Sequence, residues 1–260
     1  MLHPIHPESP VRYVAIGDSF TEGVGDEGPD GAPRGWADRV AAGLARVLGH
    51  PIDYANLAIR GRLLEPIVHE QLDAALALRP LPTLLSLNGG GNDVMRPGAD
   101  VVALSKLTIH AVDRCVAAGV PVVLLSGADP SARLPFGPVI HRRASALTAA
   151  ISARLPRPSV TFVDAFHDPQ LRRPEYWSPD RLHLAAAGHA RVAALVLGAL
   201  GHPPRDEAVP APADVTSILG EARYYREHVL PWFGRRIRGR SSGDGREPKH
   251  PGWTTVHSAG

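Results

Sequence analysis

Short apolar runs of strand length alternate with longer amphipathic segments between residues 11 and 200 of the chain. The runs are rich in Val, Ile and Leu and lack regular polar alternation, as strands buried on both faces of a sheet do. They are Val11–Ile16, Tyr54–Ile59, Thr83–Leu87, Val120–Ser126 and Val160–Val163. The intervening segments, with apolar residues at helical spacing, are Trp36–Leu48, Leu63–Leu78, Asp100–Ala118, Gly137–Leu155 and Ala186–Leu200. This alternation predicts β-α-β units and an α/β fold with a central, parallel, five-stranded sheet.

The sequence changes character after Gly201. Residues 202–213 are rich in proline and predict a linker, whereas residues 214–230 repeat apolar residues near a 3.6-residue period. We therefore expect residues 202–238 to form a linker and a helix that packs on a main domain of residues 1–201. Gly, Ser, Pro and charged residues dominate positions 239–260, which predicts a disordered basic tail. Truncation after Gly239 is then expected to leave folding unchanged.

The charge of the chain is nearly balanced, with a formal net charge of +2. Such a small net charge argues against nucleic-acid binding by the chain as a whole. Basic residues are in excess only near the C-terminal end, where they include Arg235, Arg236, Arg238 and Arg240. That cluster could contact nucleic acid or anionic lipid, but a solvated tail is the simpler interpretation, and we expect no nucleic-acid partner.

The compartment is predicted from cysteine use and from the apolar runs. The single cysteine, Cys115, excludes an internal disulfide framework and a multi-cysteine zinc site. Residues 1–10 contain no apolar stretch that a secretory signal would need. The apolar runs are also far shorter than the ~20 residues of a membrane-spanning helix. These features predict a cytoplasmic protein without stable membrane insertion.

Residues able to do chemistry follow three of the predicted strands, at the sheet edge where α/β proteins bind ligands. After the first strand comes Gly17-Asp18-Ser19-Phe20, in which Ser19 could be a nucleophile or merely a cap for the following turn. After the second comes Gly61, which could equally be an ordinary loop glycine. After the third comes Gly89-Gly90-Gly91-Asn92-Asp93, where the glycines permit close approach of a ligand and Asn92 offers an amide donor.

A fourth element, Asp180-Arg181-Leu182-His183, precedes the last predicted helix. At this spacing the carboxylate can accept a hydrogen bond from Nδ1 of the imidazole, leaving Nε2 free as a base. His189 nearby raises the alternative of a metal site, but two histidines and one carboxylate without a second acidic cluster make a poor one.

The four elements together supply the parts that acyl transfer needs. A serine hydroxyl requires a base, and His183, oriented by Asp180, can provide it for Ser19. A tetrahedral oxyanion requires donors, which the backbone N–H groups of Ser19 and Gly61 and the amide of Asn92 can provide.

The same motifs resemble the sequence blocks of the SGNH (GDSL-type) hydrolases, a superfamily of lipases, esterases and carbohydrate deacetylases. The resemblance runs from residue 11 to about residue 200, and the four blocks stand in the family's order. Phe20 replaces the Leu of the name motif, and Leu184 stands where a Pro often follows the histidine. The resemblance implies a flavodoxin-like three-layer α/β/α sandwich. It also implies Ser19 as nucleophile, His183 as base and Asp180 as its orienting partner, with Ser19, Gly61 and Asn92 as the oxyanion hole.

We therefore expect a serine hydrolase, an esterase or deacetylase, that cleaves small-molecule carboxylic esters with a short acyl group such as acetyl, without a metal or organic cofactor. One alternative is an acyltransferase that passes the same acyl-enzyme to an alcohol or amine, and another is a non-catalytic binding module. The oligomeric state is left open by the sequence.

Overall fold

The computed structural model describes residues 10–203 and 243–258 of the chain. The predicted helix of residues 214–230 and most of the predicted linker lie outside these described residues. The described part is built on a six-stranded sheet. Its strands are β1 (Arg12–Ile16), β2 (Ile52–Asn56), β3 (Leu84–Leu87), β4 (Val122–Leu125), β5 (Val160–Val163) and β6 (His250–Val256).

Helices connect the strands, and several are short. The α-helices are α1 (Ser19–Glu22), α2 (Gly35–Leu48), α3 (Leu64–Pro66), α4 (Leu72–Ala77), α5 (Gly91–Val94), α6 (Val101–Ala117), α7 (Gly137–Ser152) and α8 (Ala186–Ala199). A π-helical turn, η1 (Ile67–Gln71), joins α3 to α4, and 3₁₀ turns occur at η2 (Ser131–Arg133) and η3 (Pro174–Tyr176).

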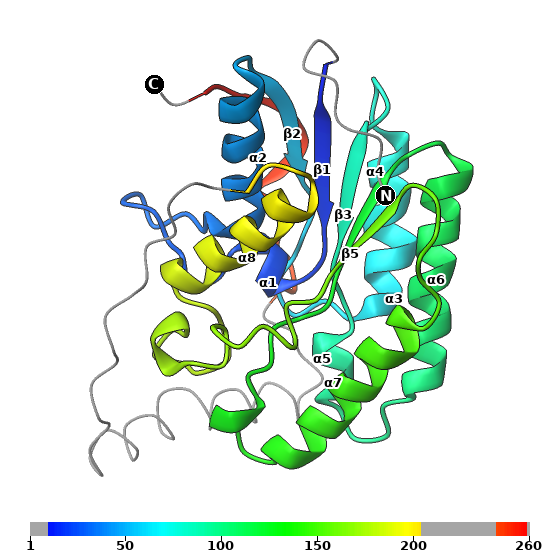
Figure 1. Ribbon diagram of the computed structural model, residues 1–260, viewed down its shortest axis with the longest axis vertical. Coiled ribbons are helices and arrows are strands. Elements are labelled where there is room, and N and C mark those ends of the chain that lie inside the picture. Colours follow the sequence, from blue (N-terminus) through cyan, green and yellow to red (C-terminus); the bar gives the residue numbers. More distant parts are fainter. Residues whose placement is uncertain (1–9, 204–242, 259–260) are drawn as a thin grey trace.

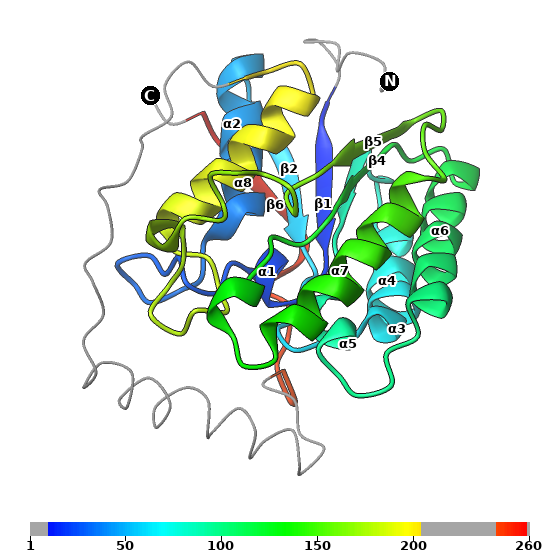
Figure 2. The same cartoon turned by 60° about the horizontal axis from the view of Figure 1, so that its bottom comes forward.

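The sheet has the strand order β5-β4-β3-β1-β2-β6, and its first five strands are parallel. Helices α2 and α8 cover one face, and α3, α4, α6 and α7 cover the other, so the fold is a three-layer α/β/α sandwich (Figure 1). Parallel strands connected through helices place all their carboxyl ends at one edge. At this edge α1, α5 and the start of α7 come together (Figure 2).

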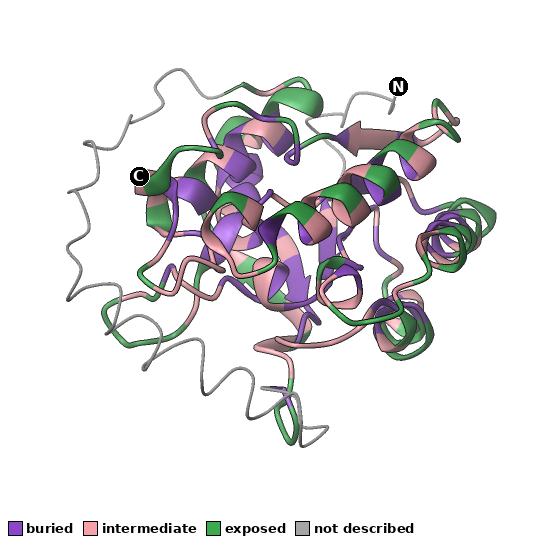
Figure 3. Cartoon of the chain, turned by 90° about the horizontal axis from the view of Figure 1, so that it is seen from below, coloured by how far each residue is buried: buried purple, intermediate pink, exposed green. Residues whose placement is uncertain are grey.

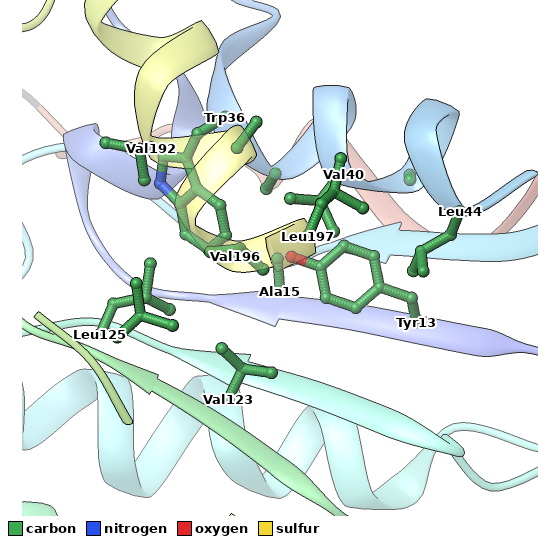
Figure 4. Close-up of a cluster of buried hydrophobic side chains, with 14 of the residues drawn as sticks. Tyr13, Ala15, Trp36, Val40, Leu44, Val123, Leu125, Val192, Val196 and Leu197 are labelled. Carbon is green, nitrogen blue, oxygen red and sulfur yellow. The ribbon is translucent and has the colours of Figure 1, made fainter. Parts of the chain in front are cut away.

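Two apolar clusters, one on each face of the sheet, hold the layers together. Side chains of α2 and α8, among them Trp36 and Leu197, pack on β1 residues such as Tyr13 (Figure 4). On the other face, Leu72 and Val112 pack against Leu85. The helices bury one side and expose the other, as their amphipathic sequences predict (Figure 3).

The predicted parallel strands β1 to β5 are confirmed, but the sheet has a sixth strand, and the prediction of a disordered tail from 239 to 260 is wrong for residues 250–256. These residues form β6, which pairs antiparallel with β2, with Val256 opposite Ile52 and Thr254 opposite Tyr54. Backbone hydrogen bonds to the open edge of β2 order this segment although it is poor in apolar residues. Trp253 adds an anchor, since its Nε1 donates to the carbonyl of Pro80 at 3.1 Å.

The second strand also differs from its predicted position of Tyr54–Ile59. It ends at Asn56, whose side-chain oxygen accepts the N–H of Ala58 at 3.1 Å and turns the chain. The apolar residues that follow, including Leu57 and Ile59, are buried in a loop. The predicted helix Leu63–Leu78 is interrupted by η1, where the N–H of Leu72 bonds to the carbonyl of Ile67.

Among the helices in the described ranges, none has the length and apolar character needed to cross a bilayer.

Candidate active site

Ser19 begins α1 directly after the carboxyl end of β1. Asp18 caps this helix, because its Oδ1 accepts the N–H of Phe20 at 3.0 Å. Burial raises the pKa of Asp18 to about 6, while its backbone bonds and the nearby charge of His183 pull it down. Ser19 and His183 line the same cavity.

Gly17 lets the chain turn sharply between β1 and Ser19. A Cβ at this position would lie 2.9 Å from the carbonyl oxygen of Asn88 and would also overlap the side chain of Thr21, so no larger residue fits. The buried side chain of Gln71 holds the turn from the other side. Its Oε1 accepts the N–H of Gly17 at 2.8 Å, and its Nε2 donates to the Gly17 carbonyl at 2.9 Å.

Asp180 and His183 lie on one tight turn before α8. Nδ1 of His183 is 2.5 Å from Oδ2 of Asp180, so Nε2 faces away from the carboxylate. The other oxygen, Oδ1, accepts the N–H groups of Leu182 and His183 at 3.0 Å each and the hydroxyl of Ser178 at 2.6 Å.

These bonds determine the charge of Asp180. Burial alone would raise the pKa of Asp180, but its hydrogen bond to His183, the charge of that imidazole and the bond from Ser178 hold the pKa well below its usual range. Asp180 is therefore a carboxylate at neutral pH, and it fixes the ring orientation of His183.

Asn92 lies in α5, after the glycine loop. Its Nδ2 donates to Oδ2 of Asp18 at 3.2 Å and to the carbonyl of Arg62 at 3.0 Å. The amide is therefore oriented by one residue from the loop that follows β1 and one from the loop that follows β2. Asp93 holds the loop in place, since its Oδ2 accepts the N–H of Leu64 at 3.0 Å.

Gly61 lies in a turn that is tied to the Ser19 helix through Arg60 and Glu22. The backbone N–H of Arg60 donates to Oε2 of Glu22 at 2.6 Å, and its guanidinium Nε donates to Oε1 at 2.8 Å. Arg60 and Arg62 flank Gly61, and their guanidinium groups could in principle bind an anionic group. In the structure the Arg60 guanidinium forms an ion pair with Glu22, and Nη2 of Arg62 lies 3.6 Å from Oε2 of Glu70.

A cavity of about 120 Å³ brings most of the candidate residues together. Ser19 of α1, Asn92 of α5 and His183 all line it. Trp177 lines it as well. Gly61 is not part of this lining as far as the described residues define it.

The C-terminal segment contacts the end of α1 and the beginning of α2. Lys249, next to β6, is largely buried, and its Nζ contacts the carbonyl oxygens of Glu22, Pro33 and Arg34 at 2.7, 2.9 and 2.8 Å. The same Nζ lies 2.6 Å from Oδ2 of Asp38 in α2. Lys249 thus joins the end of the Ser19 helix to the beginning of α2, a role that no local motif predicted.

Both ring nitrogens of His189 contact backbone groups. Its Nδ1 accepts the N–H of Trp36 at 3.2 Å, its Nε2 lies 3.1 Å from the carbonyl of Val24, and burial lowers the pKa of His189 to about 4. In residues 10–203 and 243–258, no group of three or more His, Cys, Asp or Glu side chains is arranged to hold a metal ion.

Comparison with known proteins gives a consistent result. The sequence model of the GDSL-like lipase/acylhydrolase family matches residues 15–191. No curated protein matches the chain.

Similar solved structures include a lipase from a goat rumen metagenome, with 18% identity, a TM-score of 0.59, and coverage of 75% of this chain and 100% of that one. They also include TesA, with 22% identity, a TM-score of 0.56 and coverage of 73% and 97%. A variant of an acetyl xylan esterase from Geobacillus stearothermophilus has 17% identity, a TM-score of 0.58 and coverage of 76% and 98%. At these identities the likeness shows a shared fold.

Proposed function

Because the chain belongs to the GDSL-like lipase/acylhydrolase family and is therefore a carboxylic ester hydrolase, we propose that it cleaves esters of short acyl groups with Ser19, His183 and Asp180. The observation that carries this assignment is the cavity lined by Ser19, Asn92 and His183, with His183 held by Asp180. The substrate is a small-molecule ester, and neither a metal nor an organic cofactor takes part. The lone cysteine, Cys115, supports a cytoplasmic location.

In the first half of the reaction, Nε2 of His183 removes the hydroxyl proton of Ser19 as Oγ attacks the ester carbonyl carbon. The carbonyl π electrons move to oxygen and form a tetrahedral oxyanion. When this intermediate collapses, the bond to the alkoxy group breaks, and His183 returns the proton to the leaving alcohol. Asp180 stays ionised throughout and stabilises the imidazolium.

In the second half, a water molecule takes the place of the alcohol. His183 removes one of its protons as the water attacks the acyl-enzyme, and collapse of the second intermediate releases the acid and restores the Ser19 hydroxyl. The mechanism therefore needs one base that accepts and returns a proton twice, which the orientation of His183 toward Asp180 supports.

The oxyanion is stabilised by the backbone N–H of Ser19 and by Nδ2 of Asn92, both of which belong to residues that line the cavity, whereas a contribution from the N–H of Gly61 rests on the sequence motif alone. The Asn92 amide is already oriented by Asp18 and Arg62. The longer of these two bonds, at 3.2 Å to Asp18, is the one that we propose is exchanged for the oxyanion.

Two variants test the assignment. Ser19→Ala and His183→Ala should each abolish turnover of p-nitrophenyl butanoate while melting close to the wild-type temperature. Ser152→Ala and His110→Ala, on the outer helices α7 and α6, are matched controls that should keep full activity. A fluorophosphonate probe should label the wild type at one site and leave Ser19→Ala unlabelled. Wild-type turnover by Ser19→Ala would overturn the mechanism.

A further inference from the structure

The cavity beside Ser19 continues as an apolar slot between α7 and the sheet. One side is formed by Ile140, Ala144, Leu147 and Ile151, which are spaced so that they share one face of α7. The facing side includes Phe162 of β5, which packs with the apolar cluster on this face of the sheet. The slot is therefore shaped by large apolar side chains that approach it from two layers of the sandwich.

Two polar residues of the slot wall, Asn88 and Ser126, direct their hydrogen bonds into the protein. Nδ2 of Asn88 donates to the carbonyl of Leu125 at 3.1 Å. The hydroxyl of Ser126 donates to Oδ1 of Asp164 at 3.2 Å and accepts the N–H of Phe166 at 2.9 Å. A hydrocarbon chain entering the slot would leave these polar atoms paired, whereas a substituent with its own donors would lose its bonds to water.

The slot lies on the side of the site where the acyl group belongs. In the proposed mechanism His183 protonates the leaving alcohol, so the alcohol lies toward His183 and the acyl chain away from it. The slot instead adjoins the glycine loop before Asn92, since a Cβ on Gly90 would be only 3.0 Å from Cδ2 of Leu147. An acyl group whose carbonyl oxygen faces Asn92 would extend along Leu147.

The volume limits the length of that chain. The whole cavity measures about 120 Å³, and an apolar cavity of about 150 Å³ is enough to hold one benzene molecule. We infer that the slot binds an unbranched acyl chain of about four to six carbon atoms and makes this chain length, rather than acetyl or long-chain acyl, the preferred substrate. This inference rests on the proposed function and names the acyl class that it uses.

The profile of kcat/KM over p-nitrophenyl esters from acetyl to palmitoyl tests the inference. Each methylene added up to the optimum should raise kcat/KM about fourfold, because one more methylene leaves water. Beyond hexanoyl the value should fall, and palmitoyl should be at least about tenfold below the maximum, since the excess chain has no place in the slot.

Variants in α7 test whether the slot determines the preferred acyl chain length. Ala144→Leu narrows the slot and should lower the ratio of hexanoyl to acetyl kcat/KM about tenfold or more. Ala146→Leu places the same substitution on the exposed side of the same helix and should leave the profile unchanged. Ile151→Ala lengthens the slot and should move the optimum toward octanoyl, which tests the inference even if Ala144→Leu folds poorly.

The outcomes separate this inference from the proposed function. Turnover that falls steadily from acetyl, or that rises to palmitoyl, would overturn the chain-length inference and leave the ester hydrolase assignment intact. An optimum at butanoyl or hexanoyl that neither Ala144→Leu nor Ile151→Ala changes would also overturn it. Absence of turnover for every ester would overturn both.

Discussion

Replacing Lys249 with methionine should lower the stability of this protein far more than an ordinary surface substitution. The ammonium group of Lys249 contacts the carbonyl oxygens of Glu22, Pro33 and Arg34 and the carboxylate of Asp38, all between 2.6 and 2.9 Å. Methionine keeps an unbranched apolar stem of similar length but removes every donor. The substitution therefore separates the loss of the charge from the loss of packing.

The magnitude follows from the burial of the pair. Burial raises the pKa of Asp38 to about 6 even though the Lys249 charge lowers it. Removing one member of a buried ion pair typically costs about 3–5 kcal/mol, because the other charge is left without a partner. Total stabilities are about 5–15 kcal/mol, and each kcal/mol lost shifts the melting temperature of a chain of this size by roughly 2–4 °C. The expected decrease is therefore roughly 6–20 °C.

The pH dependence gives this prediction a second readout. Without Lys249 the pKa of Asp38 rises further, so the folded variant takes up a proton that the unfolded chain, with an aspartate pKa of about 3.9, does not hold at neutral pH. The stability that a raised pKa contributes is fully present below the pKa of the group in the unfolded chain. It is lost as the pH rises through the pKa of the same group in the folded protein. The deficit of Lys249→Met should therefore be smaller at pH 5 than at pH 8.

Thermal melts followed by circular dichroism at both pH values provide the assay. The matched control is Lys106→Met, because Lys106 is the other lysine of the chain and is exposed on α6. Adding Asp38→Asn to Lys249→Met should recover part of the loss by removing the unpaired carboxylate. Truncation after Gly239, which also removes β6, should melt at least as low as Lys249→Met. A Lys249→Met protein that melts within about 2 °C of the wild type at pH 8 would refute the reasoning.

Three further predictions follow from the site and its surroundings. Asn92→Ala should lower kcat about 100–1000-fold with little change in KM, because an oxyanion donor acts mainly in the transition state; steady-state kinetics showing the reverse would make Asn92 a binding residue. Burial alone would raise the pKa of Asp26, but hydrogen bonds from Arg39 and Arg34 lower it to about 2. Its stabilising contribution of about 2 kcal/mol is present above the unfolded pKa and lost as pH falls toward 2. Urea melts should therefore show Asp26→Asn weaker than wild type at pH 6, with the gap closing by pH 2. Treatment with EDTA should leave ester turnover unchanged, and a loss that zinc restores would contradict the proposed chemistry.

Local sequence patterns predicted the strands that form short continuous apolar runs and the helices that bury apolar side chains at helical spacing. The five parallel strands and the long helices α2, α6, α7 and α8 were found for this reason. The same signal misplaced β2, because Leu57 and Ile59 are apolar and buried without belonging to a strand. Apolar character reports burial, whereas the hydrogen bond from Ala58 to the Asn56 side chain decides where the strand ends.

The parts that the sequence did not reveal depend on contacts between distant residues. Nothing near Gln71 indicates that its side-chain amide pairs with the backbone of Gly17. The segment around Pro251 and Gly252 is a poor strand by its own composition and becomes one only because β2 offers an open edge. In contrast, the turn of Asp180 and His183 was predictable, because both partners lie within four consecutive residues.

The position of β6 at the edge of the sheet imposes an order on biosynthesis. Lys249 and Glu22, whose carbonyl it contacts, are separated by 227 positions. A ribosome that adds about 5–20 residues per second therefore synthesises the Ser19 helix roughly 10–45 s before it adds Lys249. During that interval the nascent chain carries β2 as an unprotected strand edge, the kind of surface on which neighbouring chains aggregate. Chains arrested before residue 250 lack β6 and therefore keep the edge of β2 open.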